Sequence, residues 1–451
     1  MFFKRRGCGG NMSFTLELLK QNIQPYLNSS CIWIAYSGGC DSHVLLYSLA
    51  QLREELNINL KAIHINHGLS PLANEWEEHC REICEQLSIS YLAISVNANQ
   101  NRTSPEEAAR IARYKEWKKL INKNEVLLLA HHQDDQAETV LLQLLRGSGV
   151  KGLAAMPAKQ DFSQGRLCRP LLGYQRQELH SYAVDHNLNW IDDPSNFDTD
   201  FDRNFLRHDV IPLLESRWPA LKRTLSRNAS HQAEADQLLS ELAFQDWHHV
   251  HLDNKIIVSS LLKLSEQRQR NVLRYWLSDI CELSLPDTIH LKRIMEEVIT
   301  AAEDAKPEVI WRGGEVRRYQ GFLYGIKNLP QSPENKVLLW RDLSQSLELG
   351  DASCLSSKVI MGQGLSQKKL QNSEISIRFR QGGEMCKPVG RGQTHQLKKL
   401  FQEWQVPPWQ RAFVPLVYVN DELAQAVGYC LSEKYAASSN EAGWLIGKTS
   451  I

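Results

Sequence analysis

A glycine-rich turn, Ala35-Tyr36-Ser37-Gly38-Gly39-Cys40-Asp41-Ser42, stands between an apolar run and a helical pattern. The apolar run, 32–35, predicts a buried strand, and the apolar spacing of 42–52 predicts a helix that starts at the turn. Glycines lack a Cβ and let backbone N–H groups approach an anion closely. The amino end of the helix adds partial positive charge, and two serine hydroxyls add donors. The pattern predicts a phosphate-binding loop made of Ser37, Gly38, Gly39, Cys40, Asp41 and Ser42.

Asp41 is the acid of this loop, and its carboxylate would repel a phosphate directly. Its natural role is to hold Mg²⁺, which neutralises both groups. The loop has no Gly-Lys-Ser/Thr ending. It is similar instead to the Ser-Gly-Gly-x-Asp-Ser loop of the ATP-pyrophosphatase (PP-loop) superfamily. This resemblance implies that the chain binds ATP and cleaves it between the α and β phosphates.

Strand and helix patterns alternate through the first 200 residues. Buried strands are expected at 61–66, 91–96 and 126–130, and helices at 75–87, 105–121 and 135–145. Such alternation predicts an α/β fold with a doubly wound parallel sheet, which binds ligands at the carboxyl ends of its strands.

Polar residues follow two of these strands. His67 comes after 61–66, either beside the nucleotide or as part of a turn ended by Gly68. After 126–130 comes the segment His131-His132-Gln133-Asp134-Asp135-Gln136-Ala137-Glu138-Thr139. Its acids can share one helix face. Either they cap the helix, or they complete a metal site or hold a substrate ammonium group. Asp41 and Asp134 are the candidate Mg²⁺ ligands.

Arg110 lies on the expected helix 105–121, near Tyr114. Arginine is a good phosphate partner, so Arg110 is a candidate catalytic residue. The alternative is an ordinary surface arginine.

Composition places the chain among ordinary globular proteins. It has 451 residues, with 52 basic and 52 acidic residues, so any basic surface must be local. Its ten cysteines include no Cys-x-x-Cys pair, which disfavours a zinc or redox site and fits a reducing cytoplasm. No apolar run approaches the roughly 18 residues that span a bilayer, and no secretory signal follows the basic start.

The chain is expected to divide into several parts. Residues 1–11 are expected as a disordered tail and 12–222 as the catalytic ATP-binding domain. A helical domain is expected at 223–328, a proline-containing linker at 329–365 and a small α+β domain at 366–451.

The last part carries a local concentration of basic residues. Seven lie between 378 and 411: Arg378, Arg380, Lys387, Arg391, Lys398, Lys399 and Arg411. Aromatic residues are interleaved, among them Trp404 and Trp409. Basic charge with aromatics suits a folded RNA, although the pattern equally fits a solvated face over an aromatic core, and Trp404 is expected in that core.

Taken together, the motifs resemble the tRNA(Ile)-lysidine synthetase family. The resemblance rests on the phosphate loop, Asn66-His67-Gly68-Leu69, the His131–Thr139 segment, Arg146-Gly147-Ser148-Gly149, Arg169-Pro170-Leu171-Leu172, and the stretch from Asp193-Pro194-Ser195-Asn196 to Arg203-Asn204. It covers about 31–218 and resumes near 378–411.

The resemblance implies a reaction and its partners. The C2 oxygen of the wobble cytidine in an isoleucine tRNA with a CAU anticodon attacks the α-phosphate of ATP, and free L-lysine then displaces AMP from C2. The candidate catalytic residues are Asp41, Asp135, Glu138 and Arg110. The resemblance also implies that the helical domain at 223–328 and the small domain at 366–451 contact tRNA. Asp134, Asp135 and Glu138 remain equal candidates for holding the ammonium group and accepting its proton.

Three other functions share some of these features. One is PP-loop tRNA thiolation, which typically needs paired cysteines. Another is an ammonia-using synthetase, although nothing resembling a glutaminase domain precedes the loop. The last is an RNA-binding protein that senses ATP, which would bind nucleotide without releasing pyrophosphate.

Overall fold

The computed structural model describes residues 13–68, 70–96, 105–302, 305, 307–327, 333, 336–350 and 353–450. The chain forms two compact units, Met1–Glu241 and Leu242–Ile451. The tail expected at 1–11 lies outside the described residues.

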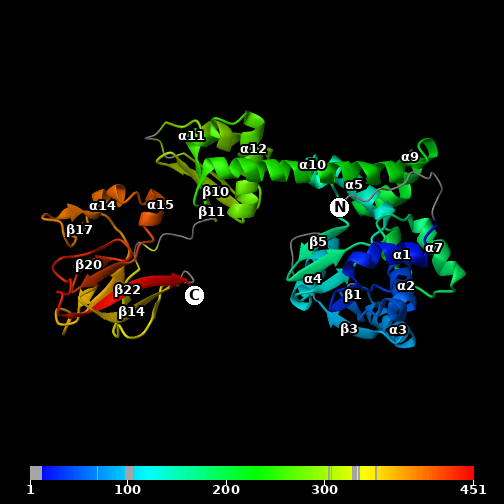
Figure 1. Ribbon diagram of the computed structural model, residues 1–451, viewed down its shortest axis with the longest axis horizontal. Coiled ribbons are helices and arrows are strands. Elements are labelled where there is room, and N and C mark those ends of the chain that lie inside the picture. Colours follow the sequence, from blue (N-terminus) through cyan, green and yellow to red (C-terminus); the bar gives the residue numbers. More distant parts are fainter. Residues whose placement is uncertain are drawn as a thin grey trace. The chain divides into compact units, whose positions relative to one another are not determined.

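A six-stranded sheet organises the first unit (Figure 1). Its strands are β1 (Cys31–Ala35), β2 (Leu60–Asn66), β3 (Ser90–Ser95), β4 (Glu125–Leu128), β5 (Lys159–Phe162) and β6 (Gly165–Cys168). They lie in the order β3-β2-β1-β4-β6-β5, with every pair parallel except β5 and β6. The chain steps outward from β1 to β3 and then returns to β4 on the other side of β1. The expected doubly wound sheet is confirmed, and its direction reverses at β1.

Alternating side chains of β1 supply two separate cores. Ile32 and Ile34 pack into a core with α1, α2, α3 and α7, whereas Trp33 packs with Trp117 of α4 on the opposite face. Helices therefore cover both faces, as a buried parallel sheet requires. The helices are α1 (Leu16–Ile23), α2 (Cys40–Leu56), α3 (Ala73–Gln86), α4 (Pro105–Leu120), α5 (Gln133–Leu145), α6 (Val150–Leu153) and α7 (Arg176–Asp185).

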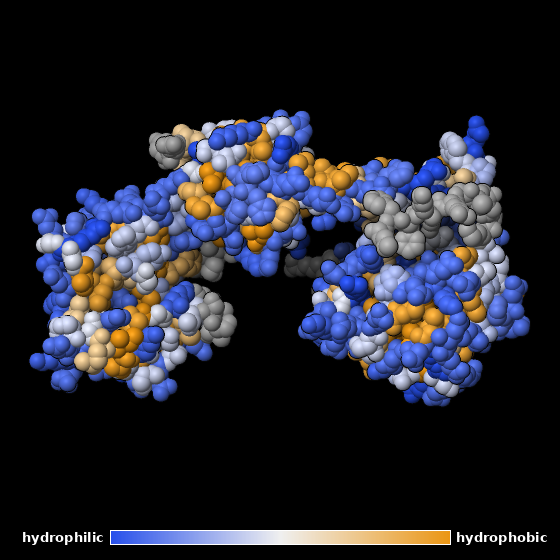
Figure 2. Space-filling model, in the orientation of Figure 1, coloured by the Kyte–Doolittle hydropathy of each residue, from blue (hydrophilic) through white to orange (hydrophobic). Residues whose placement is uncertain are grey.

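One short helical turn precedes the sheet, and a series of short helical segments follows it and leads into one long helix. They are η1 (Gln24–Tyr26, after α1), η2 (Pro194–Phe197), α8 (Asp202–Phe205), the π-helical turn η3 (Leu206–Val210), α9 (Ile211–Arg217) and the 30-residue α10 (Leu221–Val250). Exposed apolar side chains, including Leu238 and Phe244, lie along α10, where Figure 2 shows an orange patch. None of the described helices is long and apolar enough to cross a membrane.

The segment after α10 contains the expected helices and also a sheet that the sequence pattern did not indicate. The helices are α11 (Val258–Leu261), α12 (Glu266–Tyr275), η4 (Trp276–Ile280), α13 (Thr288–Arg293) and η5 (Ile294–Val298). The antiparallel strands are β7 (His251–Leu252), β8 (Lys255–Ile257), β9 (Glu308–Trp311), β10 (Gly314–Tyr319) and β11 (Phe322–Ile326). These strands are short, and charged residues such as Arg317 and Arg318 interrupt their apolar alternation. Their pattern is therefore weak in the sequence.

The expected linker, 329–365, is only partly a linker. Within it, β12 (Leu338–Leu339), β13 (Leu347–Glu348) and β14 (Ser353–Met361) belong to the sheets of the C-terminal part. Trp340 and Leu355 are buried in the same core as Ile377 and Val417. Most of the start of this segment lies outside the described residues, and the strands after it were not expected because their pairing partners lie far away in sequence.

The C-terminal part has the expected α+β character. Its further strands are β15 (Leu365–Ser366), β16 (Ile375–Arg378), β17 (Met385–Cys386), β18 (His395–Gln396), β19 (Leu416–Val419), β20 (Glu422–Ala426), β21 (Cys430–Leu431) and β22 (Ala442–Ser450). All of its paired strands are antiparallel. Helices α14 (Leu397–Glu403) and α15 (Pro408–Arg411) cover a small core of their own.

Candidate active site

The glycine-rich loop joins β1 to α2 in a geometry that only glycine fits easily. Gly38 has a φ of +85°, and a Cβ there would lie 2.6 Å from Ile191 Cδ1 and 2.9 Å from Cys80 Sγ. The amide of Ile191 donates to the Gly38 carbonyl at 3.0 Å. Ser42 Oγ donates to the Gly39 carbonyl at 2.9 Å and lies 3.0 Å from Ser37 Oγ. The loop is therefore closed by its own hydroxyls and held from outside by Ile191.

Sheet topology places this loop between the segments that follow β2 and β4. Because β1 is paired with β2 on one side and β4 on the other, their carboxyl ends share one edge. His67 follows β2, and His132 begins the turn into α5 after β4. The sheet changes direction here, which is where open α/β sheets bind ligands. The structure thus brings together three of the motifs found in the sequence.

His132 links the loop to α5 through carboxylates. Its Nε2 lies 3.4 Å from Asp41 Oδ2 and 3.4 Å from Asp135 Oδ2, and its backbone N–H donates to Asp135 Oδ2 at 3.0 Å. Burial opposes a charged imidazole, but Asp135 and Asp41 outweigh it and raise the pKa of His132 to about 9. Nδ1 of the ring accepts from the Asp135 backbone N–H at 3.4 Å, so the proton that the two carboxylates favour is the one on Nε2, which faces them both.

The second oxygen of Asp41, Oδ1, is buried and has no hydrogen-bond partner within the described structure. A buried carboxylate oxygen without a partner is costly, so it indicates a position that a ligand fills. Mg²⁺ suits it, since that ion commonly uses one or two protein carboxylates together with substrate phosphates and water. No group of three or more metal-binding side chains occurs among the described residues. Asp41 alone fits this mode of binding.

Asp135 and Glu138 are held by two arginines that the sequence analysis left unassigned. Arg203 Nε donates to Glu138 Oε2 at 2.8 Å, and Arg207 Nε donates to Glu138 Oε1 at 2.7 Å. Both guanidinium groups also approach Asp135 Oδ1, at 3.5 and 3.2 Å. Burial would raise the pKa of Asp135, but His132 and Arg203 hold it well below its usual range. The spacing of the two arginines, four residues apart on one helical stretch, was the signal that could have identified them.

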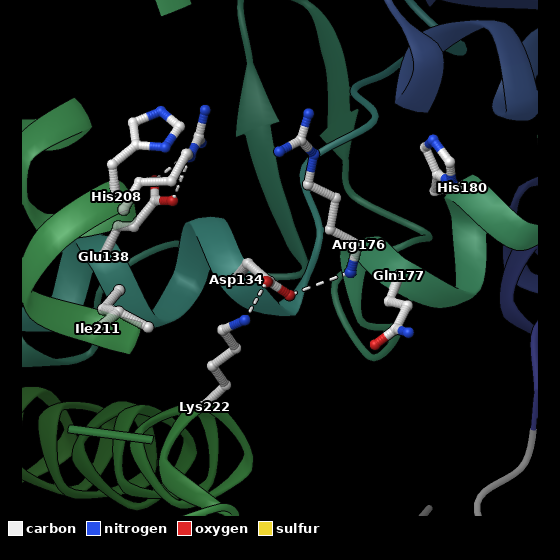
Figure 3. Close-up of a pocket in the computed structure, with 9 residues that line it drawn as sticks. Asp134, Glu138, Arg176, Gln177, His180, His208, Ile211 and Lys222 are labelled. Atoms are coloured by element: carbon white, nitrogen blue, oxygen red, sulfur yellow. Dashed lines mark hydrogen bonds and ion pairs between the residues drawn. The ribbon is translucent and has the colours of Figure 1, made fainter. Parts of the chain in front are cut away.

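Both carboxylate oxygens of Asp134 are engaged by other groups, and its expected role as a Mg²⁺ ligand stays a prediction. Its Oδ1 accepts from Lys222 Nζ at 2.7 Å, and its Oδ2 accepts from the Arg176 backbone N–H at 3.0 Å (Figure 3). Both of its oxygens are therefore occupied away from Asp41. The cause is helical geometry, because neighbouring residues of α5 project in directions about 100° apart.

A cleft of about 460 Å³ opens beside Asp134. Asp134 and Glu138 line it with negative charge, and Arg176, Arg207 and Lys222 line it with positive charge (Figure 3). This volume lies in the usual range for small-molecule sites. Walls of both signs can accommodate a zwitterion.

The remaining sequence candidates lie around this centre. His67 Nδ1 is buried without a partner in the described structure, and burial lowers its pKa to about 4, so the ring is neutral. Cys40 is buried at the start of α2. Arg110 is exposed over the ring of Tyr114, 5.6 Å from its centroid, and makes no ion pair with Asp41, Asp135 or Glu138 among the described residues. The structure thus leaves Arg110 outside the charged network.

The sequence of this chain matches known protein families along most of its length. A PP-loop domain model matches residues 13–214, a TilS substrate binding domain matches 258–324 and a TilS substrate C-terminal domain matches 375–447. A tRNA(Ile)-lysidine synthase of Coxiella burnetii (strain RSA 493 / Nine Mile phase I) is 45% identical over 433 residues, covering 96% of both chains. The chain belongs to the tRNA(Ile)-lysidine synthase family.

Other lysidine synthases are nearly as similar. The protein of Legionella pneumophila (strain Paris) is 43% identical, over 92% of this chain and 94% of its own length. That of Pseudomonas syringae pv. tomato (strain ATCC BAA-871 / DC3000) is 39% identical over 90% of each chain. The likeness spans the whole chain, including the parts after the PP-loop domain, so the family assignment does not rest on the loop alone.

Gly38→Ala is expected to destabilise the lysidine synthase fold. The left-handed backbone costs a Cβ-bearing residue about 1–2 kcal/mol, and Ile191 and Cys80 must also move. Gly39→Ala is the matched control, because its φ is −74° and its nearest new contact is 3.6 Å. Thermal unfolding without nucleotide should show a lower Tm for Gly38→Ala only. Equal Tm values would mean that the loop relaxes around a side chain.

Glu138→Gln is expected to lower stability by about 3 kcal/mol. The substitution removes one charge from a buried network and leaves two guanidinium groups facing Asp135 alone. Glu82→Gln, on the exposed face of α3, should stay within about 0.5 kcal/mol of the unmodified protein. Urea unfolding of both variants measures the difference. A loss below 1 kcal/mol would show that solvent already screens the Glu138 pairs.

Proposed function

We propose that this enzyme ligates L-lysine to C2 of the wobble cytidine in an isoleucine tRNA with a CAU anticodon, converting ATP to AMP and pyrophosphate and forming lysidine. The observation that carries the proposal is the buried, unpartnered Oδ1 of Asp41 beside a phosphate-binding loop, in a chain of the lysidine synthase family. The described helices include no membrane span, and nine described cysteines are free thiols. Both facts suit action on tRNA in the cytoplasm.

The first step activates the base. The C2 oxygen attacks the α-phosphate, and pyrophosphate leaves, so negative charge must be stabilised on the phosphates. The loop amides, Ser37, Ser42 and the amino end of α2 supply donors and partial positive charge there. Mg²⁺, held by Asp41, would neutralise phosphate charge. His132 Nε2, 3.4 Å from Asp41 Oδ2, keeps that carboxylate oriented.

The second step joins lysine to the activated base. An amine must lose its proton before it attacks C2 and displaces AMP, and a carboxylate can accept that proton. The cleft beside Asp134 offers partners for both ends of a free amino acid, with acids for an ammonium group and bases for a carboxylate. Asp135 and Glu138 are already compensated by Arg203 and Arg207. Asp134 is paired with Lys222, so each of the three acids has a basic partner, and Asp134 and Glu138 are the two that line the cleft.

In this proposal Arg110 binds a phosphate and takes no part in the charged network around Asp135 and Glu138. Its guanidinium is exposed, near Arg169, and belongs to the same unit as the loop. A phosphate of ATP or of the tRNA backbone is the group that such an exposed cation attracts. His67, neutral and with one buried nitrogen unpartnered, is suited to a hydrogen bond with nucleotide.

Thiolation of tRNA is disfavoured by the state of the loop cysteine. Burial raises the pKa of the Cys40 thiol to about 12. A thiol with that pKa is not a nucleophile at neutral pH. Cys40 is therefore not suited to carry sulfur in such a reaction.

Only part of the basic segment 378–411 is available for tRNA. Carboxylates pair with four of its residues, namely Arg378 with Asp421, Arg380 with Glu384, Lys387 with Glu433 and Arg391 with Glu403. Arg411 is buried and donates to the Val406 carbonyl. Lys398 and Lys399 on α14 are exposed and make no ion pair among the described residues. These two lysines are the cations we assign to RNA phosphates.

An aromatic cleft lies at the end of the same helix. Trp404, Tyr429 and Tyr324 line an opening of about 480 Å³, and Trp404 is stacked on Tyr429 at an interplanar angle of 18°. The expectation that Trp404 lies in the core is half right, because it packs against Phe401 but also borders this cleft. Aromatic faces beside cations suit unpaired bases. We call Lys398, Lys399, Trp404 and Tyr429 the RNA-contact surface.

Asp41→Asn is expected to abolish pyrophosphate release while tRNA affinity stays within about two-fold. The amide keeps the size of the side chain but cannot provide a charged metal ligand. Pyrophosphate release with ATP, tRNA and lysine, and tRNA binding by filter retention, measure the two effects. Asp209→Asn, outside the network, is the control. Full pyrophosphate release by Asp41→Asn would remove this residue from the mechanism, and absence of release by the unmodified protein would remove the proposed function.

Deleting residues from 328 onward is expected to weaken tRNA binding by at least about ten-fold and to leave ATP affinity nearly unchanged, since the lost surface contacts phosphates. The cut must precede β12, because a cut near 370 would leave β14 without its partner β22. The double substitution Lys398→Ala with Lys399→Ala tests the same surface in the full chain. Unchanged tRNA affinity in both proteins would contradict the assignment.

A further inference from the structure

Two cysteines meet beneath the RNA-contact surface. The Sγ atoms of Cys386, on β17, and Cys430, on β21, are 3.7 Å apart, although the residues are 44 positions apart in sequence. Backbone hydrogen bonds fix the two segments beside them, from Val389 N–H to the Leu431 carbonyl at 3.0 Å and from Glu433 N–H to the Lys387 carbonyl at 2.9 Å. The contact therefore belongs to the folded domain and not to two loose loops.

We propose that Cys386 and Cys430 form an oxidisable thiol pair, which closes to a disulfide on reaction with a hydroperoxide and thereby weakens tRNA binding at the RNA-contact surface. The first half of the proposal rests on the two thiols alone. The second half rests on the proposed function of this surface. Neither residue has a role in the adenylation or ligation steps described above.

Cys430 is the attacking thiol because it is the more exposed cysteine of the pair. Cys386 is buried, with 2% of its surface exposed, whereas Cys430 is only partly buried. The pKa of Cys430 is lowered, chiefly by the hydrogen bond between the two sulfurs. A backbone hydrogen bond and the nearby Arg391 lower it further, and burial opposes them. The hydrogen bond between the sulfurs raises the pKa of Cys386. The partly exposed Cys430 can therefore meet a peroxide first, and the buried Cys386 lies close enough to resolve the oxidised sulfur.

The chemistry balances with hydrogen peroxide as the oxidant. The Cys430 thiolate attacks the O–O bond and becomes a sulfenic acid, and one water leaves after proton uptake. The Cys386 thiol then attacks the sulfenic sulfur, an S–S bond forms, and a second water leaves. Two thiols lose two electrons and two protons, and the peroxide accepts both to give two molecules of water. A thiol reductant reverses the step.

Other cysteines of the chain are not placed for this reaction. Cys80 and Cys84, one helical turn apart on α3, are both fully buried in the first unit. Burial raises the pKa of Cys84 to about 12 and that of Cys80 still further. Cys354 is partly exposed, and its sulfur contacts the hydroxyl of Thr449. Cys354 is therefore a suitable control for unspecific oxidation.

Closure of the disulfide must disturb the aromatic cleft. An S–S bond is about 2.05 Å long, so the sulfurs have to approach by roughly 1.6 Å. Cys430 directly follows Tyr429, whose ring contacts Phe401 and stacks on Trp404. Cys386 packs in the core of Leu397, Leu400 and Phe401, which carries α14. Movement on either side shifts the rings or the helix that holds the two lysines.

The test compares the reduced and the peroxide-treated full-length enzyme. Peptide mapping under non-reducing conditions should show a Cys386–Cys430 crosslink with the loss of two hydrogens. The crosslink should be absent from Cys430→Ser and Cys386→Ser and retained in Cys354→Ser. The affinity for tRNA should fall on the order of ten-fold on oxidation, in line with the loss of aromatic stacking, and should return with a thiol reductant. Cys430→Ser should keep its affinity through the same treatment.

Each outcome decides one half of the proposal. Absence of the crosslink, or overoxidation of Cys430 without an S–S bond, overturns the thiol pair. A crosslink with unchanged tRNA affinity overturns the link to the RNA-contact surface. The reduced enzyme provides the separate check on function, because failure of the reduced enzyme to bind tRNA would contradict the proposed function and leave the crosslink result standing.

Discussion

Three acids and three bases meet at the start of α5, and the arrangement of the catalytic unit depends on their balance. Asp41 comes from the phosphate loop, Asp135 and Glu138 from α5, and Arg203 and Arg207 from a stretch some 65 residues later, with His132 between them. Each charge is costly to bury alone, so the network holds these three segments in one geometry. It leaves a single carboxylate oxygen of Asp41 without a partner, at the place where phosphates and a metal ion would meet.

Much of the catalytic unit could be predicted because its signals are local. Gly38 and Gly39 mark a turn by their own conformational freedom, and the strand and helix periods around them are strong. The residues that contact these motifs in the folded protein could not be predicted from local patterns. That Ile191 closes the loop, or that Arg203 and Arg207 neutralise Glu138, depends on contacts between segments distant in sequence. The partners of Asp134, Lys222 and the Arg176 backbone, likewise come from segments that its own neighbourhood in the sequence does not indicate.

The basic segment shows a related limit. Counting charges between 378 and 411 predicted a broad RNA-binding face, but acids such as Asp421 and Glu433 lie outside that window and pair with its members. Folding reduces the available positive charge largely to Lys398 and Lys399 on one short helix. Sequence composition thus predicted the presence of a basic surface better than its extent. The strands found within the expected linker were missed for a similar reason, because the strands that pair with them lie outside that segment.

The pairing of β14 with β22 also bears on how the protein is made. Nine residue pairs join Ser353–Met361 to Ala442–Ser450, and some 80 residues separate the two strands. At usual rates of translation, β14 emerges from the ribosome roughly 4–16 s before its partner exists. During that interval its long unpaired edge is a site for wrong association with other nascent chains. The edge of β1 that receives β4 waits at least as long, since Cys31 pairs with Glu125, so both units expose an unpaired strand edge while they are being made.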